Sequence, residues 1–142
     1  PLDYYFSGAA AENRALALAQ MMRLGLDSSL ALRFPHELSI GQLQRAALAR
    51  ALVLRPKLLI LDESMSALYL SLQAQLLNLL STIKEELKLS ILFISHDIGQ
   101  VGYIADHIVV MWQGELVEAG PADALLDQPR HSYTQKLLNA AL

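Results

Sequence analysis

Two acidic residues follow a short apolar stretch near the middle of the chain. The stretch Leu58–Leu61 stands shortly after Pro56 and is followed directly by Asp62 and Glu63. A short apolar run between chain breakers predicts a buried strand, but a carboxylate buried without compensation is costly. We therefore expect both carboxylates just beyond the carboxyl end of this strand, where ligands bind in a parallel α/β sheet.

A second polar group stands where a helix is expected to begin. Ser39 precedes a helix predicted over Ile40–Leu54, and Gln42 follows Ser39 by three residues, which is the spacing of a capping box. In one interpretation these residues only start the helix. In another, the N–H groups and positive dipole end of the helix let Ser39 and the Gly41 N–H bind a phosphate. Both interpretations can hold at once.

One histidine also follows a predicted strand. His96 comes two residues after the apolar stretch Ile91–Ile94, although a lone histidine is more often an ordinary surface or core residue. Asp62 likewise has a structural alternative, since it can simply cap the end of its strand. The chain has no cysteine, and no zinc site is expected because the spacing of zinc ligands is lacking at the other histidines, His36, His107 and His131.

The elements that must position these residues alternate between strands and helices. Apolar residues at helical spacing from Leu72 to Leu87 predict a helix of about 17 residues between the first two strands. A third strand is expected over Ile108–Trp112, with a turn into an antiparallel edge strand over Glu115–Glu118. This alternation predicts an α/β fold with a mostly parallel sheet. A loop is expected over Arg33–Glu37, and further helices over Glu12–Leu24, Asp97–Ala105, Pro121–Leu126 and Tyr133–Ala141.

Composition narrows the possible functions. The 142 residues suit one domain, and the first residue is Pro1 rather than Met, so we expect a fragment or a processed chain. The net charge is −3 without a basic run, so nucleic acid is not expected as a partner. Apolar residues make up 54% of the chain and the mean hydropathy is +0.32, which suggests a face that is meant to be covered.

Together these stretches resemble the ATP-binding subunits of ABC transporters. The order and the intervals fit that family: Asp62 lies 20 residues after Gln42, and His96 lies 34 residues after Asp62. The tail Asp127–Leu138 is most similar to oligopeptide, dipeptide and nickel importers. The matching motifs are the LSGGQ signature at Leu38–Gln42, the Walker B strand at Leu58–Glu63, the start of the D-loop at Ser66–Leu68 and the switch histidine at His96.

The resemblance implies a role for each of these residues. Asp62 would orient Mg²⁺, directly or through water, and Glu63 would polarise the attacking water. His96 would contact the γ-phosphate of ATP. The residues that bind the ATP cofactor would be Ser39, Gly41 and Gln42.

The resemblance also implies a fold, partners and a location. Residues 1–55 would be part of the helical subdomain with the signature motif, and residues 56–142 the second half of a P-loop ATPase-like core with C-terminal helices. The implied activity is ATP hydrolysis that drives import of peptides or metal chelates. Implied partners are a second ATPase subunit, a transmembrane permease and the missing N-terminal half of the subunit, at a cytoplasmic position on the inner face of the cell membrane.

The sequence departs from the family near the nucleotide. It has no G-x-x-x-x-G-K-[ST] loop, which would hold the phosphates of ATP. Ile40 stands where the first signature glycine belongs, and Tyr69 replaces an aspartate that couples the sites of the two subunits. The isolated chain is therefore expected neither to bind ATP tightly nor to be active alone. A non-catalytic scaffold or interaction module with the same fold is the alternative.

The family's sheet has one more strand, which leads into the phosphate-binding loop. It lies between the strand of the switch histidine and the strand that matches Ile108–Trp112. Without it we expect a gap in the sheet, with two free strand edges and an exposed apolar face.

Overall fold

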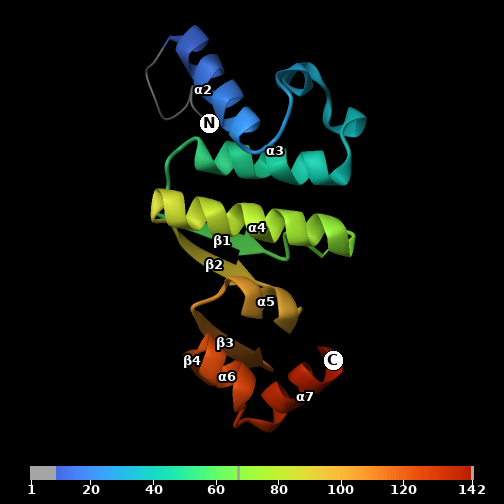
Figure 1. Cartoon of the computed structure of the whole chain (residues 1–142), viewed down its shortest axis with the longest axis vertical. Helices are drawn as coiled ribbons and strands as arrows, with labels where there is room; N and C mark the ends of the chain where they lie inside the picture. The colour runs from blue at the N-terminus through green and yellow to red at the C-terminus, as the bar shows by residue number, and fades with distance from the viewer. Residues whose placement is uncertain (1–8, 67, 142) are drawn as a thin grey trace. The chain divides into compact units, whose positions relative to one another are not determined.

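The computed structural model describes residues 9–66 and 68–141 and has helices alternating with strands in that part (Figure 1). The predicted α/β fold class is confirmed. None of the helices in this part could span a membrane. The elements in chain order are α2 (Ala10–Arg23), the 3₁₀ helices η1 (Ser28–Leu32) and η2 (Pro35–Glu37), α3 (Ile40–Leu52), β1 (Leu58–Asp62), α4 (Leu70–Leu87), β2 (Ser90–Ile94), α5 (Ile98–Ile104), β3 (His107–Trp112), β4 (Glu115–Pro121), α6 (Ala122–Asp127) and α7 (Ser132–Ala141).

Residue contacts divide the chain into two compact units. Unit 1 takes in the described residues up to Leu59 together with Ser64–Ile91, and unit 2 takes in Ile60–Glu63 and the described residues from Leu92 onward. Strands β1 and β2 each run from one unit into the other. The division at residue 55 into a helical subdomain and an ATPase core stays a prediction.

The strands form two separate pairs. β1 pairs with β2 in parallel, and β3 pairs with β4 in antiparallel orientation. Within the described residues, β2 and β3 belong to different sheets, so the expected gap between the second and third strands is present. In the part of the chain that the structure describes, no strand joins the β1–β2 pair to the β3–β4 pair.

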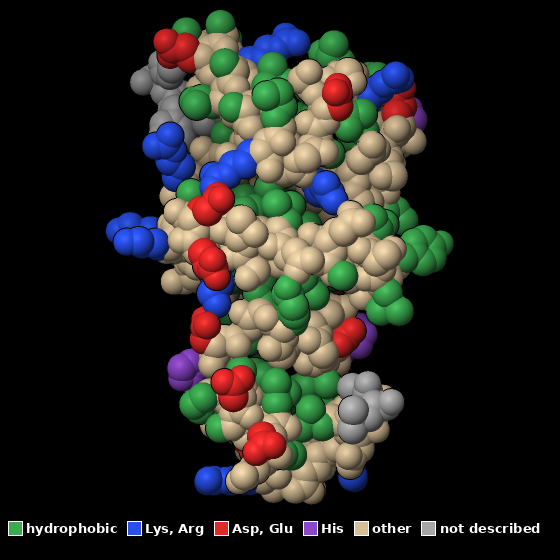
Figure 2. Space-filling model, in the orientation of Figure 1, with side chains coloured by type: hydrophobic (Ala, Val, Ile, Leu, Met, Phe, Trp, Pro, Cys, Tyr) green, Lys and Arg blue, Asp and Glu red, His purple; other side chains and the backbone are tan. Residues whose placement is uncertain are grey.

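The exposed apolar face expected from the sequence is also present. Leu58 and Ile60 of β1 are 53% and 59% exposed, and Leu92 and Ile94 of β2 are 49% and 43% exposed, whereas Leu59 is buried. Successive side chains point to opposite faces of a strand, so the described residues cover one face of β1, and the buried strand predicted over Leu58–Leu61 is buried on that face alone. Figure 2 shows that hydrophobic side chains reach the surface in both units.

The core of unit 1 comes from the apolar sides of α3 and α4, which lie side by side (Figure 1). Arg45 of α3 donates from Nη2 to Gln75 Oε1 of α4 at 3.1 Å. α4 has 18 residues and is followed by its C-cap Lys88, whose φ of +50° lies in the left-handed region. The buried side chains of the two helices are Leu48, Ala49, Leu52, Leu76, Leu77, Leu80 and Ile83.

Unit 2 contains its own small core and the predicted turn between β3 and β4. The turn residues Gln113 and Gly114 have φ of +52° and +84°, and positive φ at both central positions is typical of a two-residue hairpin turn. The core consists of Ile108, Val110, Ala122 and Leu125.

One predicted loop contains a short helix. The sequence predicts a loop over Arg33–Glu37, but Pro35–Glu37 forms η2. The Glu37 carboxylate accepts a hydrogen bond from the Phe34 N–H at 2.7 Å, and proline is favourable at the first position of a helix. The other predicted helices and strands are found, and each of their ends lies within three residues of the predicted one.

Candidate functional site

The two acids of the Walker B-like stretch lie at the carboxyl end of β1, as expected. Asp62 is the last residue of the strand and Glu63 is the next residue, and both are exposed. Glu63 has φ of +46°, a left-handed conformation that is uncommon for a residue with a side chain. Its N–H donates to the Ile94 carbonyl of β2 at 3.0 Å, which fixes the main chain one residue beyond β1.

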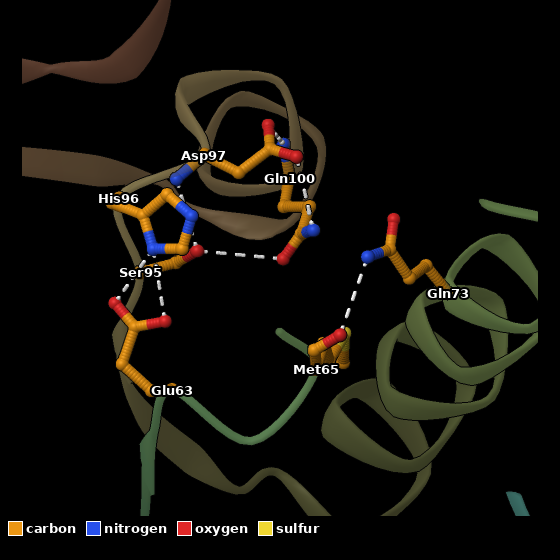
Figure 3. Close-up of polar contacts among 7 residues, drawn as sticks. All are labelled: Glu63, Met65, Gln73, Ser95, His96, Asp97 and Gln100. Atoms are coloured by element: carbon orange, nitrogen blue, oxygen red, sulfur yellow. Dashed lines mark hydrogen bonds and ion pairs between the residues drawn. The ribbon is translucent and has the colours of Figure 1, made fainter. Parts of the chain in front are cut away.

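Glu63 and His96 meet within unit 2. His96 Nδ1 lies 3.0 Å from both carboxylate oxygens of Glu63 (Figure 3). Because an ionised carboxylate only accepts hydrogen bonds, Nδ1 carries the proton in this pair. This hydrogen bond, and then the negative charge of Glu63, raise the pKa of His96 above its ordinary value. The imidazole is thereby held in one orientation, and its charged form, in which both ring nitrogens carry a proton, is favoured.

The segment that carries His96 is stabilised by a polar network (Figure 3). Ser95 Oγ accepts from the Asp97 N–H at 3.1 Å. The Asp97 carboxylate caps α5 by accepting from the N–H groups of Gly99 and Gln100 at 2.9 and 3.1 Å. The buried Gln100 also donates from Nε2 to Asp97 Oδ2 at 3.0 Å. Sequence reasoning missed this network, although an aspartate just before a helix is a recognisable N-cap.

Asp62 is suited to a metal ion that is mostly held by other ligands. Its carboxylate makes no hydrogen bond or ion pair within residues 9–66 and 68–141, and carboxylate oxygen is the ligand type that Mg²⁺ prefers. The described residues contain no group of three or more His, Cys, Asp or Glu that could hold a metal. Mg²⁺ commonly binds one or two carboxylates together with substrate phosphates and water, and Asp62 fits that pattern.

The signature-like residues lie in unit 1, at the start of α3. Ser39 Oγ accepts from the Gln42 N–H at 3.3 Å, and Gln42 Oε1 accepts from the Ser39 N–H at 2.9 Å. The capping-box interpretation is therefore confirmed. A Cβ on Gly41 would lie 3.6 Å from Leu72 of α4, an ordinary contact. The fold itself therefore does not require glycine at this position, and the start of α3 lies beside the start of α4.

The residues fit part of an ATP site. Glu63 and His96 come together with Asp62 beside them in the chain, whereas Ser39, Gly41 and Gln42 belong to the other unit. The carboxylates and the helix start match the metal, water and phosphate contacts of ATP, but the sequence contains no loop to cradle the phosphates.

Unit 2 has a further polar contact that the sequence did not indicate. The Glu118 carboxylate of β4 accepts from the N–H groups of Arg130 and His131, at 2.8 and 3.1 Å. The Thr134 hydroxyl, then the Arg130 N–H, lower the pKa of Glu118 below its ordinary value. Glu118 thus holds the segment before α7, which is part of the tail that resembles peptide and nickel importers, against β4.

Comparisons with known proteins agree with these features. A family model described as ABC transporter matches residues 6–66. The oligopeptide transport ATP-binding protein OppF of Escherichia coli (strain K12) is 46% identical over 129 residues, covering 91% of this chain and 39% of that protein. The dipeptide transport ATP-binding protein DppF of the same organism is 46% identical over 140 residues. The match covers 99% of this chain and 42% of that protein. The chain thus spans about two fifths of the length of these relatives.

Solved structures of ATP-binding cassettes are similar to this chain in fold. MJ1267, an ATP-binding cassette of an ABC transporter in its ADP conformation, matches with a TM-score of 0.77 and 26% identity, covering 96% of this chain and 54% of that one. A dimeric structure of the cassette MJ0796 bound to ADP and Pi matches with a TM-score of 0.74 and 29% identity, covering 86% and 53%. In sequence and in fold, this chain therefore resembles part of the ATP-binding subunits and cassettes of ABC transporters.

Proposed function

We propose that this chain is part of an ATPase subunit that couples ATP hydrolysis to the import of peptides. The observation that carries the proposal is the pair formed by Glu63 and His96 at the end of β1, directly after Asp62. Relatives that are 46% identical are named as oligopeptide and dipeptide transport ATP-binding proteins. The resemblance of the tail to nickel importers keeps metal chelates as a second substrate class.

The proposed roles follow from the positions of the side chains. Asp62 would bind Mg²⁺, which neutralises charge on the phosphates when it is bound. Glu63 would accept a proton from the attacking water as general base. His96 donates from Nδ1 to Glu63, and in the charged imidazole, which Glu63 favours, Nε2 also carries a proton and would donate it to a phosphate oxygen.

The start of α3 would serve a second subunit. Ser39, Gly41 and Gln42 would contact the phosphates of ATP that is held by the phosphate loop of the partner. The chain lacks such a loop, so its own site would also require the N-terminal half of an ATPase subunit. The assembled protein would lie at the cytoplasmic face of the cell membrane, bound to a transmembrane permease.

A non-catalytic scaffold is the second candidate. Ile40 is 52% exposed at the start of α3, and Tyr69 is 81% exposed just before α4. These two side chains stand where the family has a glycine and an aspartate at its nucleotide interface, and apolar surface of this kind favours protein contacts over phosphate contacts.

A reconstitution experiment separates the two candidates. The chain is combined with the N-terminal half of a related ATPase subunit, and ATP hydrolysis is measured for the original chain, for Glu63→Gln and for the control Glu115→Gln, which changes an exposed glutamate in unit 2. A general base contributes about 10²–10⁴-fold, so Glu63→Gln should lose most turnover and Glu115→Gln should lose none. Hydrolysis that persists at more than about a tenth of the original rate in Glu63→Gln would reject the base role, and an inactive but folded assembly would favour the scaffold.

A further inference from the structure

The main chain directly after Glu63 is held by two glutamine side chains of unit 1. Gln44 of α3 donates from Nε2 to the Ser64 carbonyl at 2.6 Å. Gln73 of α4 donates from Nε2 to the Met65 carbonyl at 3.2 Å (Figure 3). Two successive carbonyl groups are thus fixed by side chains from two different helices.

The hydrogen bond between Gln44 and Ser64 has only one possible direction. A carbonyl oxygen only accepts, so the Gln44 amide must present its nitrogen, and the reverse orientation would place two acceptors face to face. Gln44 Oε1 and Ser64 Oγ are both buried and have no hydrogen-bond partner in the described part of the chain. The side chain of Gln44 therefore holds the main chain of Ser64 and does not depend on the Ser64 hydroxyl.

This contact matters because Glu63 has an uncommon backbone conformation. A residue with positive φ persists where its surroundings determine that conformation. On one side, the Glu63 N–H is fixed to the Ile94 carbonyl. On the other side, the chain continues into Ser64, which Gln44 holds, and into Met65, which is 1% exposed.

We propose that Gln44 is a positioning residue that acts through the main chain of Ser64. It keeps Glu63 in the conformation in which the Glu63 carboxylate meets His96, and Gln73 gives a second support at Met65. The inference rests on the proposed function only in that Glu63 is the general base there. Its test uses no ATP hydrolysis, so the two proposals can fail independently.

The test is amide hydrogen exchange, followed by NMR in the 142-residue chain. Gln44→Met keeps the length of the side chain and removes the donor. Loss of one hydrogen bond should make the Glu63 N–H exchange about 2- to 10-fold faster. The His96 Nδ1 chemical shift should move toward its value in Glu63→Gln, a signature that a purely structural loss of packing would not produce.

Two control variants separate this contact from its neighbours. Ser64→Ala removes the hydroxyl but keeps the carbonyl that Gln44 binds, so Glu63 exchange should be unchanged. Gln75→Met removes an amide of α4 that contacts Arg45 instead, and it should also leave Glu63 unchanged.

Several results would overturn the proposal. These are unchanged Glu63 exchange in a folded Gln44→Met chain, an equal acceleration of all protected amides, or an equal effect of Ser64→Ala. If Gln44→Met does not fold, Gln44→Leu, which also lacks the donor and adds no charge, should give the same change. If neither variant folds, Gln44 is a determinant of the whole fold and the positioning role is rejected.

Discussion

His96 Nδ1 lies 3.0 Å from each oxygen of the Glu63 carboxylate, and the two residues come from the ends of neighbouring parallel strands. The side chains of His96 and Glu63 are 76% and 43% exposed. An ion pair in such a position contributes little to stability. Its importance lies in orientation, since it holds the imidazole and the carboxylate at the place where chemistry is proposed.

The first prediction concerns the titration of His96. Because Glu63 raises the pKa of His96 in the folded chain, the protonated imidazole is favoured by folding. The resulting stability is fully present below the pKa of the unfolded chain and is lost as the pH rises through the raised pKa. Glu63→Gln should lower the pKa of His96 toward its ordinary value, which NMR titration of the imidazole would measure. An unchanged His96 pKa in Glu63→Gln, with Glu115→Gln as control, would contradict the pairing in solution.

The second prediction concerns Glu118, whose pKa is lowered in the folded chain, whereas that of His96 is raised. The ionised carboxylate is favoured by folding, so its stabilising effect is present above the pKa of the unfolded chain and is lost as the pH falls through the lowered pKa. Glu118→Gln should therefore lower the urea midpoint at neutral pH, and the difference from the original chain should shrink in acid. The single tryptophan, Trp112, stacks on Tyr133 with ring centroids 5.5 Å apart, so its fluorescence reports unfolding of unit 2. Equal midpoint losses at both pH values would show that the carboxylate charge is not involved.

Some of the site could be predicted from the sequence because its signals are local. Asp62, Glu63 and His96 each follow an apolar stretch, and the ends of parallel strands are where polar side chains gather. The S-x-x-Q spacing of Ser39 and Gln42 predicted the capping box, and the structure contains it. These signals depend on neighbours within a few residues, which a sequence displays directly.

Other features could not be predicted because they join distant residues. Gln44 and Ser64 are 20 residues apart, and Glu118 and Arg130 are 12 residues apart, so no periodicity indicates either contact. Glu63 has a left-handed backbone conformation, but the sequence does not indicate it, because the residue usually found in that conformation is glycine. The exposed apolar face was predicted only from the strand that the resemblance shows to be missing, because a continuous apolar run such as Leu58–Leu61 by itself indicates a strand that is buried on both faces.

The third prediction concerns the start of α3. Ser39→Ala removes the side chain that accepts from the Gln42 N–H, and loss of such a cap costs about 0.5–2 kcal/mol. The free energy of unfolding from urea titration should fall by that amount. Ser71→Ala, an exposed serine inside α4, is the matched control and should change it far less. An equal effect of the two variants would mean that the capping box does not stabilise the chain.

The fourth prediction concerns ATP itself. The chain lacks the glycine-rich loop and lysine that supply most contacts to the phosphates. Isothermal titration of the isolated chain with Mg-ATP should therefore show no tight binding. A dissociation constant in the low micromolar range would contradict this and would require a phosphate site that the motifs do not indicate.

The fifth prediction concerns the ability of this chain to complete a site on a partner. The start of α3 keeps Ser39 and Gln42, but Ile40 adds bulk there, and Tyr69 places an exposed ring just before the neighbouring helix α4. A badly fitting side chain at a packed contact costs about 1–3 kcal/mol, a factor of roughly 5 to 150 in affinity. The chain should therefore stimulate a partner only weakly, and the double variant Ile40→Gly with Tyr69→Asp should stimulate it more.

The assay for this last prediction is the ATPase rate of a full-length relative whose own signature is disabled, with this chain titrated in. Glycine at the start of a helix lowers its stability by up to about 1 kcal/mol, so circular dichroism must first show that the double variant is folded. Leu116→Asp, which also places an acid at an exposed apolar position but lies in β4, is the control and should not increase stimulation. The folded double variant lacks the Ile40 and Tyr69 side chains that would obstruct contact with the partner's site. If it still gives no stimulation at any concentration, Ser39 and Gln42 act in this chain only as a helix cap.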